Sequence, residues 1–358
     1  MKNKKQNNLA VNFSGSKILI TGGAGFIGSN LIKMLLAATE NISITIVDNL
    51  LSAEKINVPQ NKSVNFIEGS IADDKILRQL DDRYDYVFHL ATFHGNQNSI
   101  FDPLADHDNN TLTTLKLYER LKNFKKLKKV VYASAGCSVA KKTYGPASAT
   151  HEDAPVEINQ DSPYSISKII GEFYSTYYFK QHSLPTVRAR FQNVYGLGEI
   201  LGAGKWRGTA ATVWRNVIPT FIYKALKGEP LPLQNHGRAS RDFIYVNDIC
   251  RGLLACALKG KHGDVYNLAS GHETTIRQLA ILINQITGNT AGFELLPKRS
   301  WDHSGRRFGS TTKAKQELDF VAQIRLPAGL KLTVDWTKNS LKLIESNINK
   351  HQKKIGNK

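Results

Sequence analysis

The chain has 358 residues, of which 41% are hydrophobic and 22% charged, and this ordinary globular composition excludes disordered, collagen-like and mucin-like proteins. The length suits two packed lobes better than one small module. Lysine and arginine number 48 against 30 acidic residues, so the formal net charge is +18.

The excess positive charge is concentrated in three segments, residues 1–5, 116–129 and 350–358. No aromatic-rich strand, recognition helix or zinc finger accompanies these lysines, so we expect solvated surfaces and no nucleic-acid partner. No apolar run is long enough to span a bilayer, and no apolar segment follows the basic N-terminus, so we expect neither an integral membrane contact nor a secretory signal. Three cysteines match no metal or disulfide spacing, which favours the reducing cytoplasm.

Short β-branched runs alternate with amphipathic segments through the first half of the chain, which predicts βαβ units and a doubly wound parallel sheet. We expect strands at 17–21, 43–48, 63–67, 84–90, 129–133 and 186–190, and helices at 26–38, 73–80, 106–123 and 163–182. Beyond residue 191 a glycine-rich stretch precedes helices expected at 212–227 and 333–348. This less regular half predicts a smaller, mixed α/β C-terminal lobe.

A glycine-rich loop, Thr21-Gly-Gly-Ala-Gly-Phe-Ile-Gly28, follows the first expected strand and opens the first expected helix. Gly22 permits the tight turn, Gly25 lets backbone N–H groups approach a pyrophosphate, and Gly28 lets helix and strand pack closely. Asp48 ends the second strand, where a carboxylate accepts hydrogen bonds from a ribose diol. Because Asn49 and Leu50 follow it, with no arginine for a 2′-phosphate, the sequence predicts a Rossmann domain that binds NAD rather than NADP.

These patterns predict four regions along the chain. They are a basic tail at 1–15, an NAD-binding Rossmann domain at 16–191 joined by a later strand from about 240–270, an interleaved substrate-binding lobe at 192–345, and a basic tail at 346–358.

Tyr164 and Lys168 lie four residues apart at the start of the helix expected at 163–182, so they share one helix face. A phenol with its ordinary pKa of about 10 is a poor base, and a neighbouring ammonium favours the phenolate. The pair therefore suits general acid/base catalysis on a substrate hydroxyl while NAD exchanges a hydride with the adjacent carbon.

Further motifs accompany this pair. They are His89-Leu-Ala91, Ser99-Ile-Phe-Asp-Pro103, Asn110, Arg190-Phe-Gln-Asn-Val-Tyr-Gly196, Arg241-Asp-Phe-Ile-Tyr-Val-Asn-Asp248 and Tyr266-Asn-Leu-Ala-Ser-Gly271. With them, residues 16–340 resemble an extended short-chain dehydrogenase/reductase of the nucleotide-sugar epimerase/dehydratase family. The resemblance implies tightly held NAD, a nucleotide-diphosphate sugar in the C-terminal lobe and a homodimer.

The resemblance also implies individual binding residues. For the cofactor it adds Phe26, Ile27, Ser70, Ile71, Leu90, Ala91, Thr92 and Asn110 to the glycines, Asp48, Asn49, Tyr164 and Lys168. For the substrate it implies His94, Asn193, Asn216, Val217, Leu233, Gln234, Arg241 and Arg299, with the two arginines on the diphosphate.

The sequence departs from the family at its third catalytic residue, a serine or threonine at the end of the strand before Tyr164. Gly136 stands at that position. Ser138 is our favoured replacement as the third catalytic residue, and Ser134 or a water could also hydrogen-bond the sugar oxygen. Alternatively, both serines could serve only to hydrogen-bond the backbone of a turn at the strand end.

The same segment bears on the reaction. Family dehydratases carry an Asp-Glu pair where this chain has Cys137 and Ser138, so the sequence favours an epimerase. We expect it to act at C4 through a keto-sugar, in surface polysaccharide or O-antigen synthesis. The alternatives are a dehydratase or reductase acting on a similar sugar, or a non-catalytic NAD-binding regulator. Two cationic stretches, 202–208 and 298–307, suggest an acidic or bulky sugar, and we expect Lys205 and Arg207 to face it. The alternative for both stretches is a loop that covers the diphosphate or a subunit contact.

Overall fold

A seven-stranded, wholly parallel sheet forms the larger part of the protein. The computed structural model describes residues 7–136, 139, 143–303 and 305–356. The sheet has the order β11-β7-β5-β4-β1-β2-β3. The strands are β1 (Lys17–Thr21), β2 (Ser43–Asp48), β3 (Val64–Glu68), β4 (Tyr86–His89), β5 (Lys129–Ala135), β7 (Thr186–Phe191) and β11 (Val265–Leu268). The strand order reverses between β1 and β4, which opens a crevice at their carboxyl ends.

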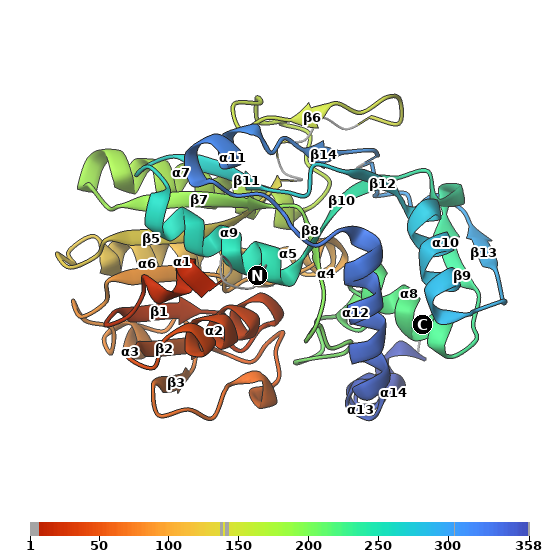
Figure 1. The fold of residues 1–358 in the computed structure, drawn as a ribbon, viewed down its shortest axis with the longest axis horizontal. Coiled ribbons are helices and arrows are strands. Elements are labelled where there is room, and N and C mark those ends of the chain that lie inside the picture. The colour runs from red at the N-terminus through yellow and green to blue at the C-terminus, as the bar shows by residue number, and fades with distance from the viewer. Residues whose placement is uncertain (1–6, 137–138, 140–142, 304, 357–358) are drawn as a thin grey trace.

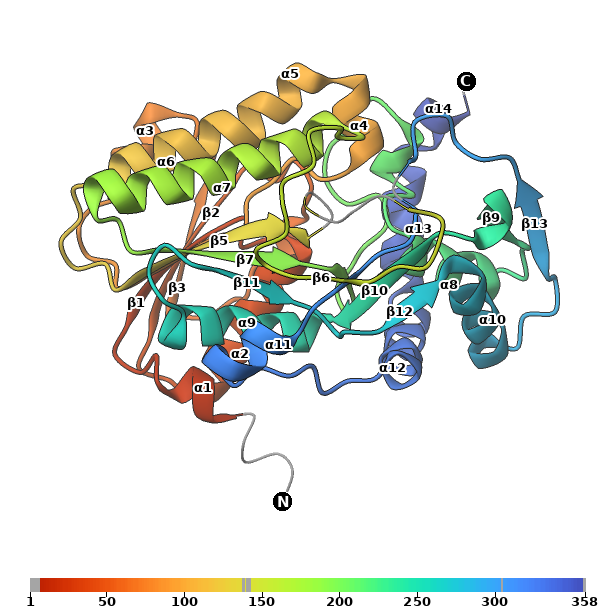
Figure 2. The same cartoon turned by 90° about the horizontal axis from the view of Figure 1, so that it is seen from above.

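Helices cover both faces of this sheet (Figure 2). One face carries α3 (Asp74–Leu77), α4 (Asn96–Phe101), α5 (Pro103–Asp106), the π-helical turn His107–Leu112, α6 (Thr113–Leu121) and α7 (Pro163–His182). The other carries α1 (Asn7–Val11), α2 (Phe26–Ala38), α9 (Val246–Lys259) and α11 (Thr312–Leu318). This two-sided cover explains why the strands read as continuous apolar runs.

Alternation along β1 shows how the two cores form. Ile18 and Ile20 pack in the core that also contains Leu31 of α2, whereas Leu19 packs in the core that contains Leu117 of α6. All three β1 side chains are fully buried. Successive strand residues point to opposite faces, so a single strand supplies both cores.

A smaller mixed lobe follows the sheet and stands at one end of it (Figure 1). Its strands are β8 (Asn193–Tyr195), β9 (Leu231–Gln234), β10 (Ser240–Tyr245), β12 (Glu273–Thr275) and β13 (Phe293–Leu296), with the short pair β6 (Ala149–Thr150) and β14 (Phe308–Gly309) nearby. Its helices are α8 (Val217–Leu226), α10 (Ile276–Thr287), α12 (Leu326–Asn339), α13 (Leu341–Asn349) and α14 (Gln352–Ile355). The prediction of a Rossmann-type α/β fold with a smaller second lobe is confirmed.

The chain crosses between the two parts more than once. After β10 in the small lobe, α9 returns to pack against α2, and β11 adds to the edge of the large sheet beside β7. The strand that returns from the segment 240–270 is therefore β11, while β10 stays in the small lobe.

Four helices differ from the sequence expectation. The helix expected at 73–80 is shorter and spans only Asp74–Leu77. The helix expected at 212–227 begins only at Val217, because residues 210–212 form a separate 3-10 turn and Asn216 is extended at the N-cap. The segment expected as one helix at 333–348 forms α12 and α13, which are separated at Ser340. The segment expected at 106–123 starts with a π-helical turn at 107–112.

The two segments expected to be basic tails contribute structure instead. Phe13 is fully buried and its ring lies 4.8 Å from that of Tyr86, so the packed domain begins before residue 16. At the other end, Ile348 and His351 are buried, and α14 continues to residue 355. Buried apolar side chains such as Phe13 and Ile348 hold these two segments against the rest of the protein. The number of lysines in each segment gave no indication of this burial.

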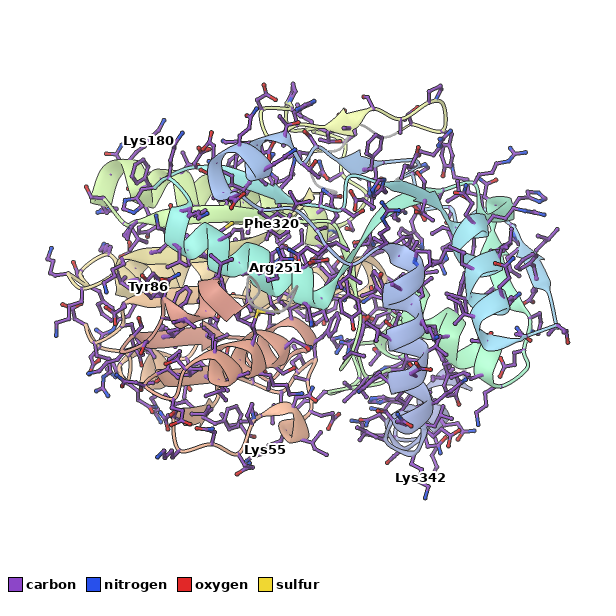
Figure 3. All side chains as sticks on the ribbon, viewed as in Figure 1. Lys55, Tyr86, Lys180, Arg251, Phe320 and Lys342 are labelled. Carbon is purple, nitrogen blue, oxygen red and sulfur yellow. The ribbon has the colours of Figure 1, made fainter. Side chains whose placement is uncertain are left out.

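Surface charge is dispersed over the exterior. Lys55, Lys180 and Lys342 are exposed, whereas Phe320 and Arg251 lie buried near the middle of the molecule (Figure 3). Within the basic segment 116–129, lysines pair with neighbouring carboxylates, as Lys116 does with Asp74 and Lys128 with Asp85. In the part of the chain that is described, no helix is long and apolar enough to cross a membrane.

Candidate active site

A cavity of about 690 Å³ lies at the carboxyl ends of the parallel strands and continues into the small lobe. The glycine loop after β1, the ends of β4, β5 and β7, the start of α7 and the start of α8 all contribute to its wall. This is the crevice in which doubly wound sheets bind ligands.

The glycine loop forms the floor of one end of the cavity. Gly22 has φ +75°, a left-handed conformation that glycine adopts without strain, and a Cβ there would collide with the backbone at Ala91. A Cβ on Gly28 would collide with the carbonyl oxygen of Gly22. No side chain caps the N-terminus of α2 at Gly25, so the first N–H groups of this helix stay available to a pyrophosphate.

Asp48 lies beside this loop at the end of β2. Its carboxylate accepts hydrogen bonds from the backbone N–H groups of Ala24 at 3.0 Å and Leu50 at 2.9 Å. Burial raises the pKa of Asp48, and these backbone donors oppose the rise. The next residue, Asn49, also lines the cavity and donates from Nδ2 to Asn109 Oδ1. The geometry fits the ribose of an NAD adenosine, because a carboxylate and an amide lie there and no arginine follows directly.

All but one of the other expected cofactor residues line the same cavity. They are Phe26, Ile27, Ser70, Ile71, Leu90, Ala91 and Thr92. Asn110 is buried behind the wall, where its Oδ1 accepts from Thr92 Oγ1 and Phe93 N, and its Nδ2 donates to Ser167 Oγ. Asn110 therefore ties the loop after β4 to α7, and this role requires no contact with the cofactor.

The tyrosine–lysine pair lies where α7 meets the cavity. Ser162 caps the helix by accepting from Ser165 N, and Pro163 occupies the first turn. Lys168 Nζ lies 5.7 Å from the centre of the Tyr164 ring and donates to the carbonyl of Ala133 at 3.0 Å. The lysine is buried, so its positive charge acts on the phenol with little screening by water. The expected four-residue spacing thus brings both side chains together at the cavity wall.

Of the two candidate serines, only Ser134 falls within the described residues. Its Oγ is buried and donates to Glu172 Oε1 at 2.5 Å. The same carboxylate accepts from Arg190 Nε and Nη2, each at 2.8 Å. Ser134 thus belongs to a buried ion-pair network that joins β5, β7 and α7. Ser138 and Cys137 lie outside the described residues.

Seven of the eight expected substrate residues line the same cavity. They are His94, Asn193, Asn216, Val217, Gln234, Arg241 and Arg299. Leu233 differs: it is fully buried in the apolar core, while its neighbours Pro232 and Gln234 line the cavity. Alternation along β9 decides this, since only one face of the strand reaches the cavity.

His94 is partly buried at the cavity wall, with its ring 5.9 Å from that of Tyr164. Burial lowers the pKa of His94 to about 3, and the positive charges of Arg215, Arg207 and Lys168 act in the same direction. The imidazole is therefore neutral at physiological pH. Its Nδ1 has no hydrogen-bond partner among the described residues, which suits a contact to a bound ligand better than proton transfer.

The structure adds polar residues that the sequence did not single out. Glu199 and Arg215 line the cavity beside Asn216, whose Nδ2 donates to Glu199 Oε1. Burial raises the pKa of Glu199 to about 7. Gln192 also lines the cavity wall. Glu199 and Arg215 belong to no short motif with a chemical reading of its own. Gln192 lies inside the motif Arg190–Gly196, in which Asn193 was the residue assigned to the substrate.

The two cationic stretches separate in the structure. Lys298, Arg299 and Arg307 line the cavity. Arg207 instead is buried and donates to the carbonyl of Leu51 at 3.0 Å, and Lys205 borders a second hollow away from the Tyr–Lys pair. The expectation that Lys205 and Arg207 face the substrate is wrong, because the glycines of 202–208 fold this loop back against the large domain.

A dinucleotide loop, a Tyr–Lys pair and a cation-lined pocket in one cavity define an NAD-dependent enzyme of the short-chain dehydrogenase/reductase class. The model of the NAD dependent epimerase/dehydratase family matches residues 18–269, and the chain belongs to this family. The predictions of this family and of NAD as cofactor are confirmed. When bound, NAD supplies the acceptor and donor for a hydride.

Known proteins resemble the chain over nearly its whole length. The crystal structure of the Bordetella bronchiseptica enzyme WbmF in complex with NAD+ is 58% identical, with a TM-score of 0.86, and covers 97% of this chain and 100% of that one. A "Putative UDP-glucose 4-epimerase" of Methanocaldococcus jannaschii is 31% identical and covers 90% of this chain and 99% of its own. A "dTDP-glucose 4,6-dehydratase" of Streptomyces niveus is 28% identical over 90% of this chain and 93% of its own.

Proposed function

We propose that the protein is an NAD-dependent epimerase of a nucleotide-diphosphate sugar, acting at C4 through a keto-sugar. The observation that carries this proposal is the Tyr164–Lys168 pair, which lies at the wall of the cavity between the glycine loop and the cationic small-lobe pocket. A sugar placed there lies between the acid/base group and the cofactor.

The chain's own residues handle the proton. Tyr164 accepts the proton of the sugar hydroxyl as the carbonyl forms, and returns it when the hydroxyl is restored on the other face. Lys168 stabilises the phenolate by its charge, and its bond to the Ala133 carbonyl fixes its position. His94, whose ring lies beside that of Tyr164, stays neutral because burial lowers its pKa to about 3, so it adds no charge to the site.

The pocket chemistry supports a diphosphate and the choice of epimerase. Arg241 and Arg299 line the small-lobe end, where planar guanidinium groups bind phosphate oxygens. Elimination of water from a sugar requires an acid and a base beside the tyrosine. The chain has Cys137 and Ser138 where family dehydratases carry their carboxylates, and epimerisation requires no such pair. WbmF has also been solved with NAD+ and UDP, which favours a uridine nucleotide here.

The setting of the enzyme follows from the same proposal. We infer a cytoplasmic enzyme that supplies activated sugars for surface polysaccharide or O-antigen synthesis. A homodimer is supported by an exposed apolar face on α7, where Ile166, Phe173 and Tyr177 are each about half exposed, next to Phe101 and Leu104 of α4 and α5. Such a face on a helix is typical of a subunit contact.

A panel of UDP-, GDP- and dTDP-sugars, including uronic acids and acylamino sugars, tests the function. Chromatography and NMR of the products should show one sugar converted to its C4 epimer without net formation of NADH. Tyr164→Phe should abolish conversion while the protein still retains NAD. A keto-deoxy sugar absorbing in alkali would instead indicate a dehydratase, net NADH consumption a reductase, and retained NAD without any product a regulator.

A further inference from the structure

Gln192 occupies the space beside the residue that replaces the family's catalytic hydroxyl. Strands β5 and β7 run side by side, with Ala135 paired to Phe191, so Gly136 and Gln192 follow their ends as neighbours. A Cβ built on Gly136 would overlap Nε2 of Gln192 and would lie 2.9 Å from its Cδ. The amide of Gln192 therefore lies where a side chain at position 136 would begin.

A second glycine completes this slot. A Cβ on Gly309, which ends β14, would lie 2.8 Å from Gln192 Nε2. Neither Gly136 nor Gly309 has a positive φ that would require glycine. Both glycines instead leave room for the Gln192 amide. The position of this side chain therefore depends on two glycines that are far from it in the sequence.

The Gln192 amide is available to a ligand. Its side chain lines the cavity together with Tyr164 and Lys168, and it makes no hydrogen bond within the described part of the chain. Ser134 differs, because its Oγ donates to Glu172 inside the buried ion-pair network. An amide that is exposed to the cavity keeps both N–H donors for a bound oxygen.

The positions of Lys168 and Gln192 converge on the end of β5. Lys168 Nζ reaches the carbonyl of Ala133 from α7, and Gln192 approaches Gly136 from β7. Ala133, Ser134 and Ala135 line the cavity wall at the end of β5, and the one hydroxyl among them, that of Ser134, already donates to Glu172. From the β7 side, the Gln192 amide is a neutral side-chain donor at this part of the cavity wall.

We propose that Gln192 Nε2 donates a hydrogen bond to the same sugar oxygen that exchanges its proton with Tyr164, in place of the missing hydroxyl at position 136. This inference rests on the proposed function. As the C–O bond becomes a carbonyl, the O–H proton passes to Tyr164 and the hydrogen of the C–H bond leaves with its electron pair to NAD+. The amide stabilises the negative charge that develops on the oxygen, and since it does not titrate it cannot relay the proton.

The test compares Gln192→Leu, Gln192→Ala and the double variant Gly136→Ser/Gln192→Ala in steady-state kinetics on the sugar that the wild type converts. Loss of one such donor should lower kcat by roughly 100-fold with KM changed only a few-fold. The double variant should recover at least about tenfold over Gln192→Ala, because the serine hydroxyl then has the vacated space. The pH at which the acidic limb of kcat falls should stay that of the wild type, since Tyr164 remains the titrating group.

Gln79→Leu makes the same chemical change on an exposed helical turn and should keep wild-type kinetics, with Tm and bound NAD measured for every variant. Activity of Gln192→Leu within threefold of wild type would overturn the inference, as would failure of the folded, NAD-bound double variant to recover. Either of these two outcomes would overturn only the role of Gln192 and would not contradict the proposed function. Failure of the wild type to convert any sugar in the panel would overturn the proposed function, and this inference with it.

Discussion

Replacing Glu199 by glutamine removes a buried acid whose protonation is linked to folding. The side chain is 3% exposed at the cavity wall, and burial raises its pKa from 4.5 to about 7. Asn216 Nδ2 donates to Oε1, whereas Oε2 has no partner among the described residues. A glutamine keeps the acceptor for Asn216 and cannot ionise.

The sign and size of the effect follow from linkage. Between pH 4.5 and 7 the folded protein holds a proton that the unfolded chain has lost, so the free energy of unfolding falls as pH rises through this window. A rise of about 2.5 pKa units at about 1.4 kcal/mol each costs about 3 kcal/mol above pH 7. With an unfolding entropy of about 2.1 cal/mol/K per residue over 358 residues, this corresponds to about 4 °C in Tm.

Thermal unfolding of the wild type and Glu199→Gln from pH 4.5 to 8, with saturating NAD, measures this difference. The Tm of the variant should rise relative to that of the wild type between pH 4.5 and 7, and it should stay about 4 °C higher above pH 7. Glu40→Gln, the same change at an exposed position, controls for the loss of a negative charge. Parallel Tm curves for Glu199→Gln and wild type would refute a buried acid that is protonated in the folded state.

Three further predictions concern the framework of the site. Gly28→Ala should weaken NAD binding in calorimetric titration and destabilise the fold by about 1–3 kcal/mol, because the added Cβ collides with the Gly22 carbonyl oxygen. Undiminished NAD affinity would contradict the close approach of the helix to the glycine loop. Glu172→Gln should lower the free energy of unfolding in denaturant by about 3–5 kcal/mol, since it leaves Arg190 buried without its charged partner. The control Glu68→Gln, in an exposed ion pair, should lower it by under about 1 kcal/mol. Equal losses would argue against a buried pair. Phe173→Glu should convert a dimer to a monomer in sedimentation, and an unchanged mass would exclude α7 as the contact.

Strand positions could be predicted closely because each buried strand is a short apolar run whose pattern is local. The expected 43–48 and 17–21 match β2 and β1 residue for residue. Helix ends were harder to place. Ser340 divides α12 from α13, and Asn216 delays α8, by contacts that periodicity does not record. The burial of Phe13 was missed for the same reason, since its partner Tyr86 is far away in the sequence.

The sequence by itself indicated the family, the cofactor and the Tyr164–Lys168 pair, because each depends on short local motifs that can be recognised without knowing which side chains meet in space. The tertiary structure alone decided which residues share the cavity: it brought in Glu199 and Gln192, and it removed Leu233 and Arg207. The physical reason is that side-chain direction depends on strand alternation and loop packing. The space at Gly136 is filled from another strand, so the residue replacing the hydroxyl could not be found by reading the segment in which it is missing.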